Sequence, residues 1–337
     1  MPRALVTGAT GLVGSHIAER LRDEGWSVRA MVRSPESARW LHRASVELVA
    51  GDVTNGPAFA AAAAGCDTIF HAAAAIMERG SWERFRALNV GGTENAIAAA
   101  EESGARLLHI SSVAVYGSAT RYRADGSRTD ETTSLPPPAS MGVYGRSKRE
   151  SEDLVLHAHA AGRIWATAVR PSVIYGPRDR QFTPRVARLL SHGIVPLIGG
   201  GRTTLAIVHA ANVADGALRA ATTGSAGGRA YNLANDGDVT VKEFVQLAGE
   251  GLGRRIRMPV VPYALARAGV AALSRAVALA KGPALATQAR SSLAFLTHDN
   301  PFSSDRARRE LEWVPPVSPS DGIRDAFRWW RENSRLG

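Results

Sequence analysis

Short apolar runs alternate with helical patterns of apolar residues through the first half of the chain. Each run is four or five residues long, and a helix-like spacing of apolar positions separates it from the next. Strands that alternate with helices in this way form parallel sheets with helices on both faces. The sequence therefore predicts an α/β fold with a doubly wound parallel (Rossmann) sheet, whose strands cover residues 4–7, 28–32, 46–49, 68–72, 107–111 and 165–169.

Capping residues mark the helices between and after these runs. The first predicted helix stops at Gly25, and a second opens at Ser34-Pro35, because serine is a good cap and proline suits the first helical position. Further along, a strand is predicted over residues 230–233, and Thr240 followed by Glu243 forms a capping box that starts another helix. The last helix is predicted to be capped by Ser320-Asp321, with an apolar face of Ile323, Phe327 and Trp330.

The strict alternation loosens after about residue 176. We therefore predict a dinucleotide-binding domain over residues 1–176 and a lobe over 177–337 that mainly binds substrate, with some segments returning to the sheet. A polar, proline-bearing stretch between residues 116 and 144 is too long for an ordinary connection and is interpreted as a lid or substrate loop. Charged residues interrupt the alanine- and leucine-rich stretch 263–286, which favours a cover helix, with contact to a membrane surface as the alternative and no membrane span.

Three glycines follow the first predicted strand, at positions 8, 11 and 14. Gly8 permits a sharp turn, Gly11 lets the backbone approach a phosphate, and Gly14 lets the next helix pack closely on the sheet. The N-terminus of that helix presents free N–H groups and the positive end of its dipole to an anion. The pattern is that of a dinucleotide pyrophosphate site, and a plain glycine-rich turn is the alternative that the motif alone leaves open.

Composition narrows the class of protein. With 45% hydrophobic and 21% charged residues, the 337-residue chain is globular rather than disordered. The single cysteine, Cys66, excludes an intramolecular disulfide and a cysteine-based metal cluster, and the first strand begins too early for a signal segment, so a cytoplasmic protein is expected. The net charge of +10 comes largely from arginines scattered over the chain, which indicates a solvated surface rather than binding to nucleic acid.

The candidate chemistry lies on the fifth predicted strand and the helix after it. Tyr144 and Lys148 are four residues apart, so a helix places both on one face, where an ammonium can lower the pKa of a phenol for proton transfer. Ser112, at the end of the strand, can hold a substrate carbonyl against Tyr144, whereas Ser111 is interpreted as capping the strand end. Asn89 is polar within an apolar helix pattern, so it either braces neighbouring backbone or holds a water in the proton path.

The chain resembles an extended short-chain dehydrogenase/reductase, in the branch of the NAD-dependent epimerases/dehydratases and 3β-hydroxysteroid dehydrogenases. The motifs that carry the resemblance span nearly the whole chain, at residues 7–14, 51–53, 71–74, 89–93, 111–117, 144–148, 170–177, 208–209 and 212–215. The resemblance implies that Ser112, Tyr144 and Lys148 are catalytic, and we add Asn89 to this set. It also implies a nicotinamide dinucleotide and no metal. The expected cofactor-binding residues are Gly8, Gly11, Leu12, Val13, Gly14, Arg33, Asp52, Val53, Ala72, Ala73, Tyr144, Lys148, Pro171 and Val173.

Two departures from the family pattern bear on specificity. NAD-preferring relatives end the second strand with an acidic residue, whereas this chain has Val32 followed by Arg33 and Ser34. An arginine there can bind a 2′-phosphate, so NADP is predicted as the cofactor with NAD as the alternative. Sugar-nucleotide epimerases of this family usually carry an arginine at the position of Leu205, four residues before His209. Arg202 is nearby, but the replacement favours a substrate without a diphosphate.

These features together predict an NAD(P)-dependent oxidoreductase that interconverts a ketone and a secondary alcohol on a largely apolar, steroid-like or acyl substrate. The alternative enzyme is a nucleotide-sugar epimerase or dehydratase that keeps NAD tightly bound. A third alternative is an NADP-sensing regulatory protein built on the same fold. The expected partners are a small-molecule substrate and a second copy of the chain, in a homodimer.

Overall fold

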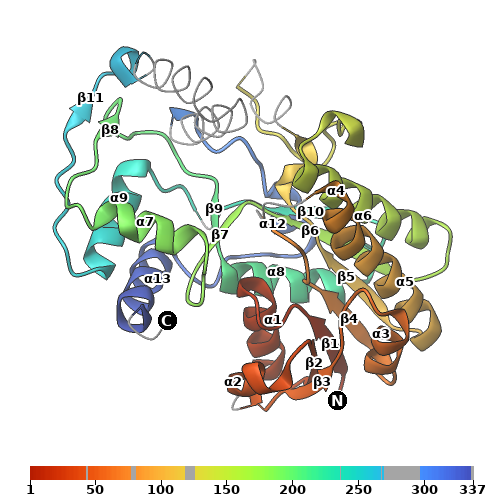
Figure 1. The fold of residues 1–337 in the computed structure, drawn as a ribbon. Coiled ribbons are helices and arrows are strands. Elements are labelled where there is room, and N and C mark those ends of the chain that lie inside the picture. The colour runs from red at the N-terminus through yellow and green to blue at the C-terminus, as the bar shows by residue number, and fades with distance from the viewer. Residues whose placement is uncertain are drawn as a thin grey trace. The chain divides into compact units, whose positions relative to one another are not determined.

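The computed structural model describes residues 1–42, 45–76, 81–117, 126–235, 237–266, 268 and 297–334. The chain divides into two compact units. The sheet unit comprises Met1–Ile174, Ala210–Ala234 and Phe302–Val317, and the second unit comprises Tyr175–His209, Asn235–Pro301 and Ser318–Gly337. Segments from three parts of the sequence therefore build the sheet unit, and its first segment ends close to the boundary predicted at residue 176 (Figure 1).

Seven parallel strands form the sheet, in the order β10-β6-β5-β4-β1-β2-β3. They are β1 (Arg3–Thr7), β2 (Ser27–Val32), β3 (Glu47–Ala50), β4 (Thr68–His71), β5 (Arg106–Ile110), β6 (Ala166–Pro171) and β10 (Ala230–Leu233). Each of the predicted strands is found within two residues of its expected bounds, because buried parallel strands read as continuous apolar runs. The predicted doubly wound parallel sheet is confirmed.

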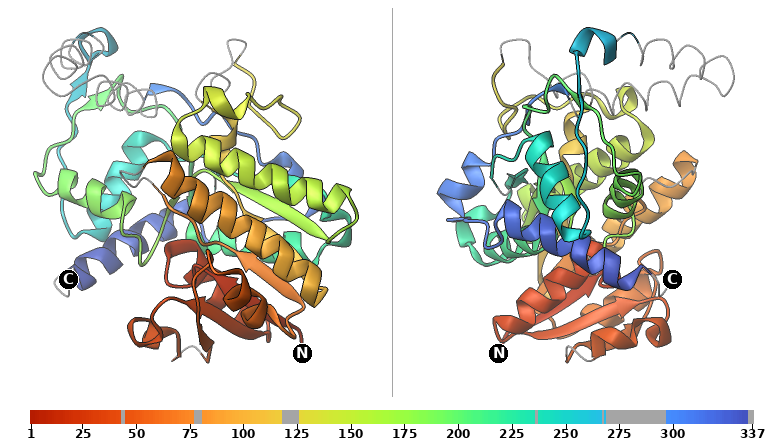
Figure 2. Two further views of the ribbon diagram at one scale, coloured as in Figure 1. Left: turned by 45° about the vertical axis from the view of Figure 1, so that its right-hand side comes forward. Right: turned by 90° about the vertical axis from the view of Figure 1, so that its left-hand side faces the viewer.

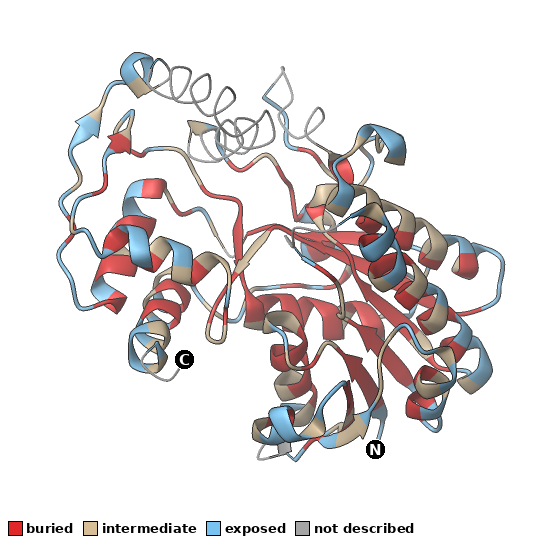
Figure 3. Cartoon of the chain, in the orientation of Figure 1, coloured by how far each residue is buried: buried red, intermediate tan, exposed pale blue. Residues whose placement is uncertain are grey.

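Helices cover both faces of this sheet. On one face, α3 (Gly56–Ala63), α5 (Gly92–Ser103) and α6 (Val143–Ala160) bury apolar residues against Leu5, Ile69 and Leu107 of the central strands. Figure 2 shows α5 and α6 lying side by side along the sheet. On the other face, α1 (Leu12–Asp23) packs on α8 (Ala210–Thr222). The strands β4 and β6 are buried along their length, whereas the edge strand β3 is partly exposed (Figure 3).

Most of the predicted helix boundaries of the sheet unit hold, with local differences. Gly25, just past the end of α1, has a φ of +78° and ends the helix as expected. The helix expected at Ser34-Pro35 is a 3₁₀ turn (Pro35–Ala38) that continues into the short α2 (Arg39–His42). The remaining short elements are α4 (Trp82–Phe85), a π-helix (Arg86–Gly91), two 3₁₀ turns (Val113–Tyr116 and Pro138–Ser140), α12 (Asp305–Glu310) and the 3₁₀ turn Gly224–Ala226.

The second unit is built from α7 (Phe182–Leu190), α9 (Val241–Gly251), α13 (Pro319–Asn333) and three short strands, β8 (Leu197–Ile198), β9 (Ile207–His209) and β11 (Val260–Val261). The chain passes into this unit through β7 (Val173–Tyr175). The capping box of Thr240 and Glu243 starts α9 as predicted. The cap predicted at Ser320-Asp321 is wrong: Ser318 caps α13 by accepting a hydrogen bond from the Asp321 N–H, because Pro319 takes the first helical position.

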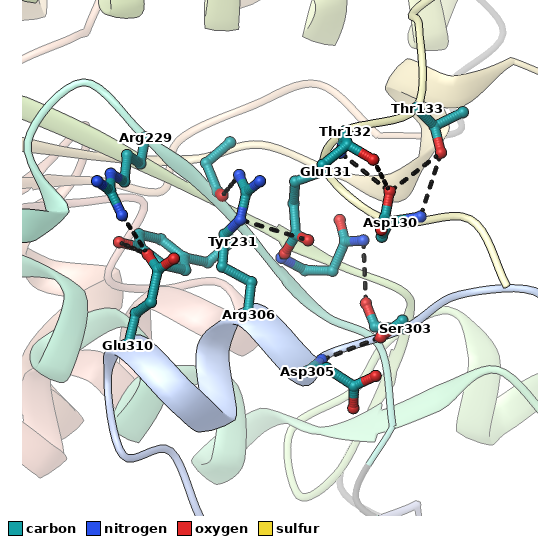
Figure 4. A network of polar contacts seen from close by, with 12 residues as sticks. Asp130, Glu131, Thr132, Thr133, Arg229, Tyr231, Ser303, Asp305, Arg306 and Glu310 are labelled. Atoms are coloured by element: carbon teal, nitrogen blue, oxygen red, sulfur yellow. Dashed lines mark hydrogen bonds and ion pairs between the residues drawn. The ribbon is translucent and has the colours of Figure 1, made fainter.

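The described part of the predicted lid is fastened to the edge strand β10. The carboxylate of Glu131 accepts a hydrogen bond of 2.7 Å from the backbone N–H of Asn232, and Arg306 lies 3.8 Å from the same carboxylate. Figure 4 shows this network next to the contact of Tyr231 with Glu310, whose phenol and carboxylate oxygens are 3.0 Å apart. Residues 129–133 therefore belong to the edge of the sheet unit, while residues 118–125 lie outside the described ranges.

Most of the stretch 263–286, for which a cover helix or membrane contact was predicted, also lies outside the described residues. Within the described ranges, none of the helices combines the length and apolarity that a bilayer crossing needs.

Candidate active site

The glycine turn after β1 has the geometry of an anion site. Gly8 has a φ of +69°, and its carbonyl accepts a hydrogen bond of 2.9 Å from the Gly11 N–H. A Cβ at Gly14 would lie 2.2 Å from the Gly8 carbonyl oxygen, and one at Gly8 would lie 2.7 Å from the Ala73 nitrogen. Side chains are therefore excluded on both sides of the turn, which brings the backbone and the open N-terminus of α1 within reach of a ligand.

This cradle fits the pyrophosphate of a dinucleotide. The first turn of α1 contains Leu12, Val13 and Gly14, and it carries no acidic residue that would repel a phosphate. Ala72 and Ala73 follow β4, and the Ala73 N–H donates to the Thr7 hydroxyl at 3.3 Å. The structure thus brings the predicted glycines and the two alanines together at the carboxyl edge of the sheet, where open α/β sheets bind their ligands.

Arg33 and Asp52 stand at the ends of the two strands beyond β1. Arg33 follows β2 with an exposed side chain, and Asp52 follows β3. The pKa of Asp52 is lowered, chiefly by hydrogen bonds from the backbone and hydroxyl of Thr54, with a contribution from the positive charge of Arg33. Val53 packs against Gly92, and its carbonyl accepts a hydrogen bond from the Asn95 side chain. Asp52 and Val53 are therefore held rigidly beside a solvent-accessible guanidinium.

Two predicted cofactor residues lie at and just after the end of β6, next to the edge strand β10. Pro171 is the last residue of β6 and is paired in register with Leu233 of β10, while Val173 begins β7. Between them, the Ser172 hydroxyl donates to the Ala234 carbonyl at 2.7 Å. This contact fixes the chain direction after β6.

Ser112 and Tyr144 meet at the start of α6. Ser112 caps the 3₁₀ turn after β5, where its Oγ accepts a hydrogen bond of 3.1 Å from the Ala114 N–H. Tyr144 lies in the first turn of α6 with a half-buried side chain. Burial raises the pKa of the Tyr144 phenol, and a hydrogen bond with Ser112 partly offsets the rise. The serine hydroxyl and the phenol are thus both placed to bind one carbonyl oxygen.

Lys148 lies one turn further along the same face of α6. Its Nζ donates a hydrogen bond of 2.6 Å to the carbonyl of Ile110, at the end of β5, and its side chain is buried. Burial lowers the pKa of Lys148 to about 8, although the negative charge of Glu152 acts in the opposite direction. A lysine whose pKa is near neutrality can exchange protons readily at physiological pH.

Asn89 braces the site rather than facing into it. Its Oδ1 accepts a hydrogen bond of 2.7 Å from the Ala75 N–H, and its Nδ2 donates to the Ala75 carbonyl at 3.2 Å and to Ser147 Oγ at 2.9 Å. Both N–H bonds of the amide are therefore used. Asn89 lies in the π-helix and ties the loop after β4 to α6, so its contacts are those of the bracing alternative.

Sequence reasoning missed a buried ion pair beneath this site. Arg170 of β6 contacts the carboxylate of Glu152 through Nε at 3.0 Å, and it donates to the Tyr116 hydroxyl at 2.8 Å. The side chains of Arg170 and Glu152 are 5% and 0% exposed. The available signal was the spacing of Tyr144, Lys148 and Glu152, since residues four apart share one face of a helix.

Other motif residues act within the framework. Asn212 of α8 exchanges hydrogen bonds of 2.8 Å with the backbone of Val317, and Asp215 forms ion pairs with Arg20 and Arg219. In the second unit, Leu205 is 1% exposed and belongs to the core of that unit, whereas Arg202 is exposed. The side chain at the expected diphosphate-binding position is therefore packed away from solvent.

The chain is similar to known proteins over most of its length. A ketoreductase of Stigmatella aurantiaca, named for 4-hydroxy-2-methyl-3-oxo-4-farnesyl-3,4-dihydroquinoline-1-oxide, is 34% identical over 334 residues, which are 97% of this chain and 96% of the relative. A 3 beta-hydroxysteroid dehydrogenase/Delta 5-->4-isomerase of Mycobacterium tuberculosis is 30% identical, covering 97% of this chain and 90% of its own length. The crystal structure of gox2253 matches with a TM-score of 0.80 and 30% identity, over 99% of both chains.

These relatives are similar to the chain along its whole length, and those named for an activity are oxidoreductases, which supports an enzyme of that general class. The profile of the NAD dependent epimerase/dehydratase family matches residues 4–234, which contain the glycine turn, Ser112, Tyr144 and Lys148. The chain therefore belongs to the NAD dependent epimerase/dehydratase family, within the extended short-chain dehydrogenases/reductases.

Proposed function

We propose that this protein is an NADP-dependent ketoreductase that interconverts a ketone and a secondary alcohol on a largely apolar substrate. The observation that carries the proposal is the arrangement of Ser112, Tyr144 and Lys148: the serine hydroxyl is hydrogen-bonded to the phenol, and the lysine follows one helical turn later. This geometry suits transfer of a proton to an oxygen atom that both hydroxyls contact.

The chain's own residues divide the work of the reducing direction. Ser112 donates a hydrogen bond to the substrate carbonyl and holds it next to Tyr144. The phenol then gives its proton to the carbonyl oxygen, and the nearby ammonium of Lys148 stabilises the phenolate that remains. When bound, the nicotinamide supplies the hydride for the carbonyl carbon. Asn89 contributes as a positioning residue, because it fixes α6 against the loop after β4.

The dinucleotide would be held by the glycine turn, Asp52 and Val53, and Ala72 and Ala73 would line it. Pro171 and Val173 would lie by the nicotinamide, and Lys148 would contact the ribose. Arg33 favours NADP over NAD, since its exposed guanidinium follows β2 at the position where a carboxylate would repel a 2′-phosphate. The lowered pKa of neighbouring Asp52 keeps that carboxylate ionised at neutral pH, and its Oδ1 accepts hydrogen bonds from the backbone N–H and the hydroxyl of Thr54. Because Arg33 is exposed, its guanidinium is accessible to a ligand.

Two observations support an apolar substrate. Leu205 is a core residue of the second unit at the position where sugar-nucleotide epimerases usually carry an arginine. Two phosphate charges without partners would be costly in a closed site, whereas an apolar body gains about 25 cal/mol for each Å² removed from water. The names of two relatives, for a farnesylated quinoline oxide and for 3β-hydroxysteroids, agree with this substrate class.

The test is a screen of steroid, polyprenyl and 3-oxoacyl ketones against NADPH and NADH, followed by nicotinamide absorbance. We expect stoichiometric oxidation of NADPH with at least one apolar ketone and exchange of the cofactor on every turnover. A second experiment tests the alternative enzyme. The purified protein is denatured and any released cofactor is measured, and thermal shifts are recorded with uridine- and thymidine-diphosphate sugars. Tightly retained NAD together with strong stabilisation by a sugar nucleotide would instead establish an epimerase or dehydratase.

A further inference from the structure

A row of buried polar side chains crosses the sheet face that α6 covers. Thr7, His71 and His109 are register partners on β1, β4 and β5, so they share one face of the sheet. The two imidazole rings stack with their centroids 5.7 Å apart, and each residue is 1% exposed. Alternation along β5 directs Ser111, which is 2% exposed, to the same face as His109.

Four atoms of this row have no hydrogen-bonding partner among the described residues: His71 Nε2, both ring nitrogens of His109, and Ser111 Oγ. Buried polar atoms are normally satisfied by protein or by ordered water, because leaving one unsatisfied costs about 1–3 kcal/mol. Isolated exceptions occur, but these four are grouped on neighbouring strands. The grouping indicates a shared partner.

Lys148 lies close to this row of polar side chains. Its Nζ donates to the carbonyl of Ile110, the residue that lies between His109 and Ser111 in the chain. Its positive charge also contributes to lowering the pKa of both imidazoles, so it lies within electrostatic range of His71 and His109. An ammonium has three N–H donors, and the contacts within the described structure give Lys148 one protein acceptor, the Ile110 carbonyl.

Lys148 and three of the four unpartnered atoms match the bonding capacity of one water molecule. The Thr7 hydroxyl accepts from the Ala73 N–H, and its oxygen lies 2.9 Å from His71 Nδ1. We assign the hydroxyl proton to this second contact, which leaves the proton of His71 on Nε2 as a donor. Lys148 supplies a second donor, while a neutral His109 nitrogen and Ser111 Oγ supply two acceptors. A water molecule accepts two hydrogen bonds and donates two, so one water would pair with Lys148 and with three of the four unpartnered atoms: His71 Nε2, one nitrogen of His109 and Ser111 Oγ.

Asn89 does not offer an alternative route to such a water. Its two N–H bonds are occupied by Ala75 and Ser147, and its Oδ1 accepts from the backbone of Ala75. We infer that His71, His109 and Ser111 bind an internal water against the Lys148 ammonium, and that His109 is a positioning residue that sets the protonation of Lys148 through this water. The catalytic part of the inference rests on the proposed function; the water site does not.

Removal of this water should shift the pKa of Lys148. A hydrogen bond accepted from the ammonium favours its charged form, so loss of the water lowers the pKa of Lys148. His109→Phe keeps a ring of similar size and removes both nitrogens, whereas His109→Gln retains a donor and an acceptor. His192→Phe, at an exposed histidine of the second unit, is the matched control.

The first measurement is the titration of the Lys148 amine by NMR, on the cofactor-free protein with labelled lysine. The chain has only three lysines, which makes the assignment direct. We expect His109→Phe to lower the midpoint by about one pH unit, His109→Gln to restore most of it and His192→Phe to leave it unchanged. Ser111→Ala removes one acceptor with little change in volume and should give a smaller shift of the Lys148 midpoint in the same direction. It replaces His109→Phe as the test if that variant does not fold.

The second measurement is a high-resolution crystal structure of the wild-type protein and of His109→Phe. We expect an ordered water within hydrogen-bonding distance of His109 and Lys148 in the first and its loss in the second. A wild-type site without this water, or an unchanged Lys148 titration in His109→Phe and Ser111→Ala, would overturn the inference. Because neither readout needs turnover, a failure of the proposed ketoreductase activity remains distinguishable from a failure of the water site.

Discussion

The guanidinium of Arg170 lies against the carboxylate of Glu152, with Nη2 and Oε1 2.5 Å apart and both side chains almost completely buried. Glu152 follows Lys148 by one turn of α6, and its charge raises the pKa that burial of Lys148 lowers. The pair therefore neutralises a buried arginine and, at the same time, supports a protonated lysine next to Tyr144. A charge pair in this position links the stability of the sheet unit to the state of the candidate active site.

Removal of one partner of this pair should be costly. Glu152→Gln leaves Arg170 buried with its charge uncompensated, and we expect a loss of about 3–5 kcal/mol in the free energy of unfolding by urea titration. The double variant Glu152→Gln/Arg170→Met should recover a substantial part of that loss, because no buried charge remains. Glu101→Gln, in the exposed pair with Arg163, is the control and should change stability little. Equal losses in the single and double variants would contradict this view of the pair.

The free energy of unfolding should fall more steeply with decreasing pH than it would if all histidines of the protein were exposed. Burial lowers the pKa of His71 to about 3 and of His209 to about 4, and it holds the pKa of His109 well below its usual value. The unfolded chain binds protons at these residues below about pH 6.5, whereas the folded chain does not, so stability falls as pH drops from 6.5 towards 4.

Near pH 5 His71 and His209 together contribute a slope of about 2.7 kcal/mol per pH unit, since each proton contributes 1.36 kcal/mol, and His109 adds to the slope in the same direction. The measurement is urea unfolding between pH 4.5 and 7, with the number of protons taken up on unfolding. His109→Phe should reduce that uptake, because it removes a histidine that burial keeps neutral, and His157→Phe, at an exposed position, should not. An uptake that His109→Phe leaves intact would mean that His109 is protonated in the folded protein.

Cofactor preference should depend on the residue after β2. Arg33→Ala should weaken NADPH binding by ~1.5–3 kcal/mol, the scale of a hydrogen bond to a charged group, and should change NADH binding little. Calorimetric titration of both cofactors measures the difference, with Arg39→Ala, an exposed arginine of α2, as the control. If both cofactors lose affinity equally, Arg33 has a structural role and does not select the 2′-phosphate.

The sheet could be predicted because its signals are local. Apolar runs such as 107–111 are typical of buried parallel strands, and a spacing of four places Tyr144 and Lys148 on one helix face without any knowledge of the fold. The pairing of Glu152 with Arg170 could not be predicted in this way, because the two residues lie on different elements that only tertiary packing brings together.

The dependence on tertiary contacts also explains the smaller differences between the predicted and the observed structure. Asn89 had two open roles in the sequence, and the choice depended on the distant partners Ala75 and Ser147. The start of α13 was misplaced by two residues because Ser318 and Ser320 are both acceptable caps, and the position of Pro319 decides between them. The two stacked imidazoles could not be predicted, since nothing local in the sequence shows that His71 and His109 lie against each other.

The most direct test of the proposed mechanism is the turnover of Tyr144→Phe with a ketone that the wild-type protein reduces. Loss of the phenol removes the proton donor but leaves Lys148 and the glycine turn intact, so we expect turnover to fall by about two or more orders of magnitude while NADPH affinity stays nearly unchanged. Tyr263→Phe, at an exposed tyrosine, is the control and should keep wild-type turnover. Comparable turnover in Tyr144→Phe and the wild-type protein would contradict the assignment of Tyr144 as the general acid.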